Sequence, residues 1–181
     1  MKRAEIIELC GVSRDFFASL AKRGQFPFLG RPEGRAEAFG RYPAAVAFKT
    51  VLALALNDAG ATQEEAGHFV EVEYRELFAI SGGSDEIEEG NVYFGYALLD
   101  VGERDPEVTR YERAALRYPL YGSRKAIGKV LDRLETRKSG QRLLAVVQVN
   151  ASEHLRLLKA RAEHLGVELP SMAPAHDGEA A

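Results

Sequence analysis

Side chains capable of covalent or metal chemistry are few in this sequence, and their spacing favours no active site. Cys10 is the single cysteine, so an internal disulfide and a cysteine-rich zinc site are both excluded. It falls in an apolar segment with no adjacent base, which favours a buried structural thiol. The histidines do not have the spacing of a metal site, and we expect them to lie on the surface: His68, His154, His164 and His176.

The stretch from Gly122 to Val130 imitates a phosphate-binding P-loop but departs from it twice. Five residues instead of four separate its glycines, and Val130 lacks the hydroxyl group that would hold magnesium. Glu86, Glu88 and Glu89 could bind a hard cation, but an exposed acidic loop over residues 81–90 is the simpler interpretation. The sequence therefore indicates no enzyme, no cofactor and no metal site.

Hydrogen-bond donors gather instead on a short helix near the N-terminus. Residues 3–10 have apolar positions at a helical period, and Gly11 ends that helix. Ser13 is a good N-cap for a second helix that runs to Arg23. Gly11-Val12-Ser13 between two helices is typical of a helix-turn-helix, because glycine permits the bend, valine packs between the helices and serine caps the second one. That second helix, about 16 Å long at roughly 1.5 Å per residue, suits the width of a DNA major groove.

The order of elements after this turn strengthens the pattern. Gly24-Gln25-Phe26-Pro27 leads into an arginine-rich loop, Arg41-Tyr42 closes the loop, a long helix follows, and Ala59-Gly60-Ala61-Thr62 precedes another helix. Residues 3–78 thus resemble the DNA-binding domain of the MerR superfamily, including its excisionase-like and phage terminase small-subunit relatives. The resemblance implies a winged helix-turn-helix, with a wing after the second helix that an Arg-Tyr pair ends.

One departure limits what the resemblance implies. MerR regulators carry Thr-x-Arg-Tyr-Tyr in the second helix, where the arginine and a tyrosine meet DNA. The aligned stretch here is Phe16-Phe17-Ala18-Ser19-Leu20, so those contacts are absent. The long dimerising helix and the cysteine-based metal site of that family are also missing. The family's mechanism of promoter activation is therefore not expected here.

The candidate DNA-binding residues form two groups. Donors on or beside the second helix are Ser13, Arg14, Ser19, Lys22 and Arg23. The resemblance implies that arginines of the wing reach phosphates or the minor groove, and these are Arg31, Arg35 and Arg41. Any single arginine could be an ordinary surface charge, so the set carries more weight than its members.

The rest of the chain predicts further helices and strands. Helices are expected over residues 43–57, from a capping box at Thr62 into the 70s, over 123–138, and over 152–165 with Ser152 as cap. Residues 91–99 and 143–149 are aromatic or β-branched and predict strands. We therefore expect an α+β protein with a winged helix-turn-helix at 1–80, an α+β domain with a small sheet at 91–169, and a disordered tail at 170–181.

Charge is unevenly distributed along the chain. Residues 1–61 carry nine Lys/Arg and six Asp/Glu, residues 62–105 carry two and twelve, and residues 106–142 carry ten and four. The middle stretch, the acidic belt, is most simply a solvated face. The basic segment 106–142 interleaves cations with tyrosines, which could bind nucleic acid through phosphate contacts and base stacking. It could equally be a solvated helix face with packed tyrosines, or neutralise the acidic belt of another subunit.

The function expected from these patterns is sequence-specific binding of double-stranded DNA by a bacterial or phage transcriptional regulator. Alternatives are a DNA-packaging or recombination accessory factor, and a protein-interaction adaptor that does not bind DNA. We expect a cytoplasmic protein, because no secretory signal or membrane span is visible. We also expect a homo-oligomer, because the acidic belt of one subunit could meet the basic segment of another.

Overall fold

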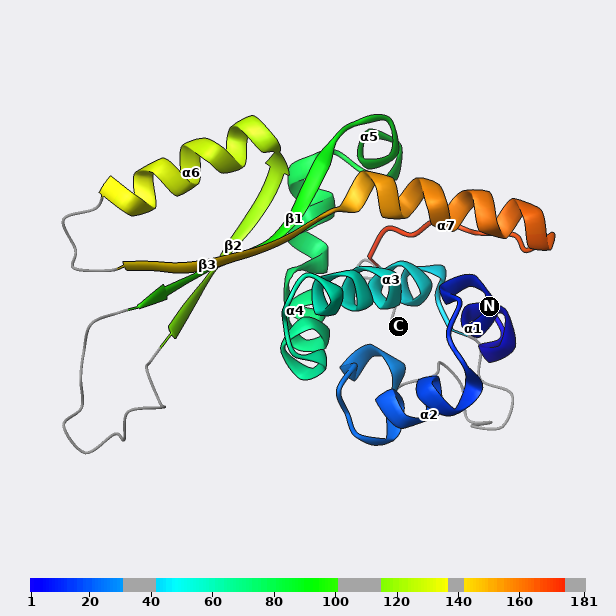
Figure 1. Ribbon diagram of the computed structural model, residues 1–181. Coiled ribbons are helices and arrows are strands. Elements are labelled where there is room, and N and C mark those ends of the chain that lie inside the picture. The colour runs from blue at the N-terminus through cyan, green and yellow to red at the C-terminus, as the bar shows by residue number, and fades with distance from the viewer. Residues whose placement is uncertain (31–41, 101–114, 137–141, 175–181) are drawn as a thin grey trace, which may run out of the picture.

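The computed structural model describes residues 1–30, 42–100, 115–136 and 142–174 of the 181-residue chain (Figure 1). The N-terminal part contains α1 (Arg3–Cys10), α2 (Arg14–Lys22), a short 3₁₀ helix η1 (Pro27–Leu29), α3 (Ala44–Asp58) and α4 (Gln63–Ser81). The remainder contains α5 (Ser84–Glu89), β1 (Val92–Asp100), β2 (Ala115–Ser123), α6 (Arg124–Thr136), β3 (Arg142–Asn150) and α7 (Ala151–Leu165). The fold is α+β, as predicted.

The three strands form an antiparallel sheet in the order β2-β1-β3. β1 is central, and its Tyr96 lies opposite Pro119 of β2 and Val147 of β3. Leu98 pairs with Ala145 whereas Leu99 pairs with Leu143, so Leu144 is an extra residue and forms a β-bulge. β2 and β3 are therefore the two edge strands among the described residues.

The two faces of the sheet are covered by different helices, because successive side chains of a strand point to opposite sides. On one face, Phe69 of α4 packs against Phe94 and Tyr96 of β1, with ring centroids 5.1 and 4.9 Å apart. On the other face, Ile127 of α6 joins a buried cluster with Leu120 and other sheet residues. Figure 1 shows α6 over one face of the sheet and α3 and α4 beyond the other.

One continuous core joins the N-terminal helices to the sheet. It includes residues of α1, α2, α3, α4, β1, β3 and α7. At its centre, the ring of Phe48 in α3 lies 6.1 Å from that of Tyr74 and 6.5 Å from that of Phe78 in α4. This core contains residues from both 1–80 and 91–169. The division of the chain into two domains at these bounds stays a prediction.

Two elements differ from the sequence-based expectations. Residues 81–90 were expected to be an exposed acidic loop, but Ser84–Glu89 form α5 with Ile87 fully buried. β2 was not predicted, because Pro119 interrupts a segment with no clear alternation of apolar and polar residues. α5 is held by α7, since Arg156 donates to the carbonyl oxygen of Glu88 at 2.7 Å and Lys159 pairs with the Glu88 carboxylate.

The ends of α7 also differ in detail from the prediction. Asn150, not Ser152, caps the helix by accepting a hydrogen bond from the Glu153 N–H at 3.1 Å. Ser152 is buried and accepts from the N–H of Val92 at 2.8 Å. Beyond the helix, Met172 is buried and its carbonyl accepts from the Tyr74 hydroxyl at 2.6 Å. This part of the expected tail packs on the core, and residues 175–181 lie outside the described residues.

Candidate nucleic-acid interface

The turn between α1 and α2 has the local geometry that its sequence predicts. Gly11 adopts a left-handed conformation with φ of 67°, which glycine takes without steric cost. The N–H groups of Gly11 and Val12 donate to the carbonyls of Glu8 and Ile7, each at 3.2 Å. Ser13 then caps α2 by accepting from the Phe16 N–H at 3.1 Å. The two predicted helices and the tight turn between them are therefore present.

The inner side of α2 is fixed to the core by Phe17 and Leu20, both fully buried. Tyr42 packs edge-on against the Phe17 ring with centroids 6.4 Å apart, and the Arg3 guanidinium lies over the same ring at 5.4 Å. Tyr42 is itself held by the start of the chain, because it exchanges backbone hydrogen bonds with Met1 at 2.8 and 2.6 Å. These contacts hold the inner side of α2 against the core.

The predicted donors lie mostly on the outer side of α2. Ser13, Arg14, Lys22 and Arg23 are exposed, whereas Ser19 is half-buried. Arg14 and Lys22 lie at opposite ends of the helix, about 12 Å apart along its axis at roughly 1.5 Å per residue.

The cations of α2 make no internal pairs within the described residues. The side chains of Arg14, Lys22 and Arg23 form no hydrogen bond or ion pair with another residue that the structure describes. Some basic residues elsewhere are paired: Lys49 with Glu71 at 2.7 Å, and Arg117 with Glu65. Among the described residues, no carboxylate neutralises these three exposed cations.

Asp15 is a residue of this surface that the sequence reasoning did not single out. At 3.6 residues per turn, Asp15 and Lys22 both point away from the buried Phe17 and Leu20. The helical spacing of Phe17 and Leu20 in the sequence was enough to identify Asp15 as an outward-facing residue. A carboxylate there repels phosphate but can accept a hydrogen bond from the amino group of cytosine.

The expected wing cannot be compared with the structure. Arg31, Arg35 and Arg41 fall in residues 31–41, outside the described residues. Before this segment the structure describes η1, and after it Tyr42, which packs in the core.

Some cations of the basic segment 106–142 contact other residues of the chain, and others are exposed to solvent. Arg117 pairs with Glu65, and the Arg124 guanidinium lies over the Tyr93 ring at 5.2 Å. Lys125 and Lys129 of α6 are exposed. Figure 1 shows α6 and α2 on opposite sides of the molecule, so these lysines do not extend the α2 surface.

The acidic belt is partly neutralised within the chain. Tyr121 of β2 donates its hydroxyl hydrogen to Glu73, and Glu65 accepts from both Thr62 and Arg117. Burial alone would raise the pKa of Glu65, but the hydrogen bonds from Thr62 and the Arg117 guanidinium outweigh it and lower that pKa. Part of the acidic belt, which was expected to be a solvated face, is thus used in joining α4 to β2.

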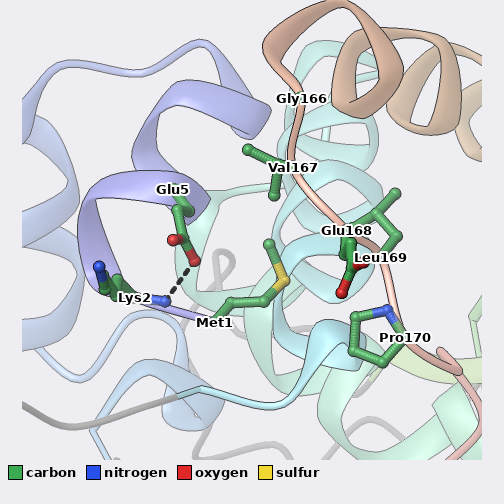
Figure 2. Close-up of a pocket in the computed structure, with 8 residues that line it drawn as sticks. All are labelled: Met1, Lys2, Glu5, Gly166, Val167, Glu168, Leu169 and Pro170. Carbon is green, nitrogen blue, oxygen red and sulfur yellow. Dashed lines mark hydrogen bonds between the residues drawn. The ribbon is translucent and has the colours of Figure 1, made fainter.

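Two hollows on the surface do not suit a nucleic acid. Figure 2 shows the larger, about 650 Å³, between Met1, Lys2 and Glu5 on one side and residues 166–170 on the other. Its charged side chains are Lys2 and the carboxylates of Glu5 and Glu168, and Glu5 accepts from the Lys2 N–H at 2.6 Å. The other hollow, about 580 Å³, lies between residues 62–73 and Arg117, and its lining includes the carboxylates of Glu64, Glu65 and Glu73.

The groups considered for chemistry are held in structural positions. Burial raises the pKa of the Cys10 thiol to about 12, although Thr50 and Arg161 act in the opposite direction. The Cys10 sulfur donates to the Ala47 carbonyl at 3.6 Å. Burial lowers the pKa of His154, against the influence of Glu153 and Asp58. Within the described ranges, no cluster of three or more His, Cys, Asp and Glu side chains could hold a metal ion.

Comparison with protein families and with curated proteins finds no match for this chain. None of the helices in the described part of the chain is both long and apolar enough to cross a membrane.

Proposed function

We propose that this protein binds double-stranded DNA through α2, as a cytoplasmic transcriptional regulator of bacterial or phage type. The observation that carries the proposal is the contrast between the two sides of α2. Phe17 and Leu20 fix its inner side, while Arg14, Lys22 and Arg23 are exposed on the rest without an internal partner among the described residues.

The local geometry supports docking in a groove. A helix that enters the major groove presents its N-terminal side chains to base edges. Arg14 and Asp15 occupy that end, directly after the Ser13 cap. Arginine can donate two hydrogen bonds to guanine, and aspartate can accept from cytosine. Lys22 and Arg23, at the other end of α2, are suited to phosphate contacts.

A protein-interaction adaptor is the second candidate, and Asp15 is the observation that favours it. Its carboxylate shares the outward face with Lys22, a mixture of charge that suits a protein surface as well as a base edge. A phosphate-only contact at this face would be opposed by Asp15, so DNA binding by α2 requires that the helix faces bases.

Titration of the full chain into labelled duplexes of random sequence tests the proposal. The double variant K22A/R23A should weaken binding strongly, because each lost phosphate contact removes counterion release. The double variant K125A/K129A is the matched control, since it removes exposed cations from α6. Equal losses from both variants would indicate diffuse electrostatic binding, and no DNA binding by the parent would favour the adaptor.

A further inference from the structure

α7 runs from the sheet to the first helix of the chain. It begins at Ala151, directly after β3 ends at Asn150, and its length is about 22 Å at roughly 1.5 Å per residue. Leu155, Leu158 and Ala162 bury one side of α7 in the core. Figure 1 shows the C-terminal half of α7 beside α1. One continuous helix therefore leads from β3 to α1.

Arg161, near the end of α7, contacts the turn between α1 and α2. Its guanidinium donates to the carbonyl oxygen of Leu9 at 3.4 Å. The same group lies where a side chain on Gly11 would begin, because a Cβ atom placed on Gly11 would be 2.4 Å from a nitrogen of Arg161. Gly11 is the left-handed residue that ends α1. The absence of a side chain at this bend lets the cation reach the backbone of the turn.

The position of this cation matches a requirement of α1. The last carbonyls of a helix have no partners within the helix, and its C-terminal end carries a partial negative charge that cations stabilise. α1 has no basic residue in its last turn. Arg161 supplies the cation instead, across a separation of 152 residues from Leu9. It thus takes the place of the local lysine or arginine that often binds the end of a helix.

We propose that Arg161 is a positioning residue for DNA reading by α2. It holds the end of α1 and the bend at Gly11, and so fixes the direction in which α2 leaves the turn. Ser13 caps α2 and Arg14 follows it, at the end of α2 that meets base edges in the proposed function. A shift of the turn would move Arg14 away from those edges. The inference rests on the proposed function, and in it Arg161 does not touch DNA.

Arg161→Ala tests the proposal, and Arg156→Ala is its matched control. Arg156 is also an exposed arginine of α7, but it donates to the carbonyls of Glu88 and Gly90 at 2.7 and 3.3 Å and so holds α5. The full chain is titrated into a duplex that the parent has selected from random sequence, at a temperature where every variant is folded. Arg161→Ala should weaken binding by roughly two- to thirtyfold, the range for residues that affect a site without contacting its ligand. Arg156→Ala should leave binding unchanged.

The salt dependence of binding separates positioning from direct contact. Loss of one phosphate contact lowers the slope of log affinity against log salt concentration by about one unit. The slope of Arg161→Ala should instead equal that of the parent. Arg161→Lys keeps a positive charge near the end of α1 and should recover part of the lost affinity. A lower slope in Arg161→Ala, or equal losses in Arg161→Ala and Arg156→Ala, would overturn the proposal.

A pair of glycine substitutions tests the contact without DNA. Gly11 and Gly166 end α1 and α7 with nearly the same conformation, φ of 67° and 65°, so alanine is strained at both. A Cβ at Gly166 meets nothing within 4 Å, whereas one at Gly11 displaces the guanidinium of Arg161. Gly11→Ala should therefore lower the melting temperature less in the Arg161→Ala background than in the parent, by about 1–4 °C. Gly166→Ala should lower it equally in both backgrounds.

These outcomes separate the inference from the proposed function. A parent that binds no duplex would contradict the proposed function, and the melting temperatures would still decide whether Arg161 holds the turn. A parent that binds DNA no better than Arg161→Ala would overturn the inference alone. So would equal effects of Gly11→Ala in the two backgrounds, since the contact of Arg161 with the turn would then be absent.

Discussion

A Cβ atom placed on Gly67 of α4 would lie 2.0 Å from the carbonyl oxygen of Gln25 and 2.7 Å from the Phe26 ring. α4 therefore rests directly on the backbone that leaves α2, with no side chain between them. Because Phe26 is fully buried, this approach fixes the distance between the candidate interface and the core.

Gly67→Ala should destabilise the protein. The methyl group meets backbone, which cannot move as a flexible side chain does, and overpacking of this kind costs about 1–3 kcal/mol. That exceeds the gain of about 1 kcal/mol that alanine brings to a helix. The melting temperature should fall by a few degrees, at about 2–4 °C per kcal/mol for a chain of this size.

Gly128→Ala in α6 is the matched control for this substitution. A Cβ at Gly128 meets nothing within 4 Å, so only the helix propensity changes and the melting temperature should rise. If Gly67→Ala raised the melting temperature as Gly128→Ala does, Gly67 would not be a close-packed contact.

The pKa of Glu65 predicts a specific dependence of stability on pH. Because folding lowers this pKa from its ordinary value of 4.5, the ionised carboxylate stabilises the fold above that value. This contribution is lost as the pH falls through the lowered pKa. Glu65→Gln keeps a residue suited to the capping box with Thr62 but removes the charge, so its melting temperature should fall less than that of the parent between about pH 7 and about pH 3.5.

Glu64→Gln provides the comparison, because the carboxylate of exposed Glu64 makes no hydrogen bond or ion pair with another described residue. This variant should follow the parent at both pH values. An unchanged pH dependence in Glu65→Gln would mean that the contacts with Thr62 and Arg117 do not favour the charged form.

Local features of the chain were predictable because they depend on neighbouring residues. The Ser13 cap, the left-handed Gly11 and the Thr62 capping box all follow from spacings of three residues or fewer. β1 and β3 were found because they are apolar segments enriched in aromatic or β-branched side chains.

Features that depend on distant partners were not predictable from the pattern. β2 is stabilised as a strand by pairing with β1 and by contacts such as Arg117 with Glu65, 52 residues away. α5 forms because Ile87 is buried and Glu88 meets α7. The contact of Tyr74 with Met172 spans 98 residues and orders a segment whose composition indicates disorder.

Cys10 should react slowly with thiol reagents in the native protein. With its pKa raised to about 12, the thiolate that performs the attack is about a thousandfold scarcer at pH 8 than for a free cysteine of pKa near 8.5. The rate of maleimide labelling, compared between native and urea-unfolded protein, measures this difference. Similar rates in the two states would contradict the buried position of the thiol.

The claim that α2 reads DNA sequence is tested most directly by a salt titration of Arg14→Ala on two duplexes. One duplex carries a site selected from random sequence by the parent protein, and the other carries the same bases scrambled. Arg14 lies at the N-terminal end of α2, and a bidentate contact with guanine contributes about 1–3 kcal/mol of discrimination. The variant must have the same melting temperature as the parent. We then predict that its affinity falls roughly 10- to 100-fold on the selected site and changes little on the scrambled one. Equal losses on both duplexes would contradict base reading by α2.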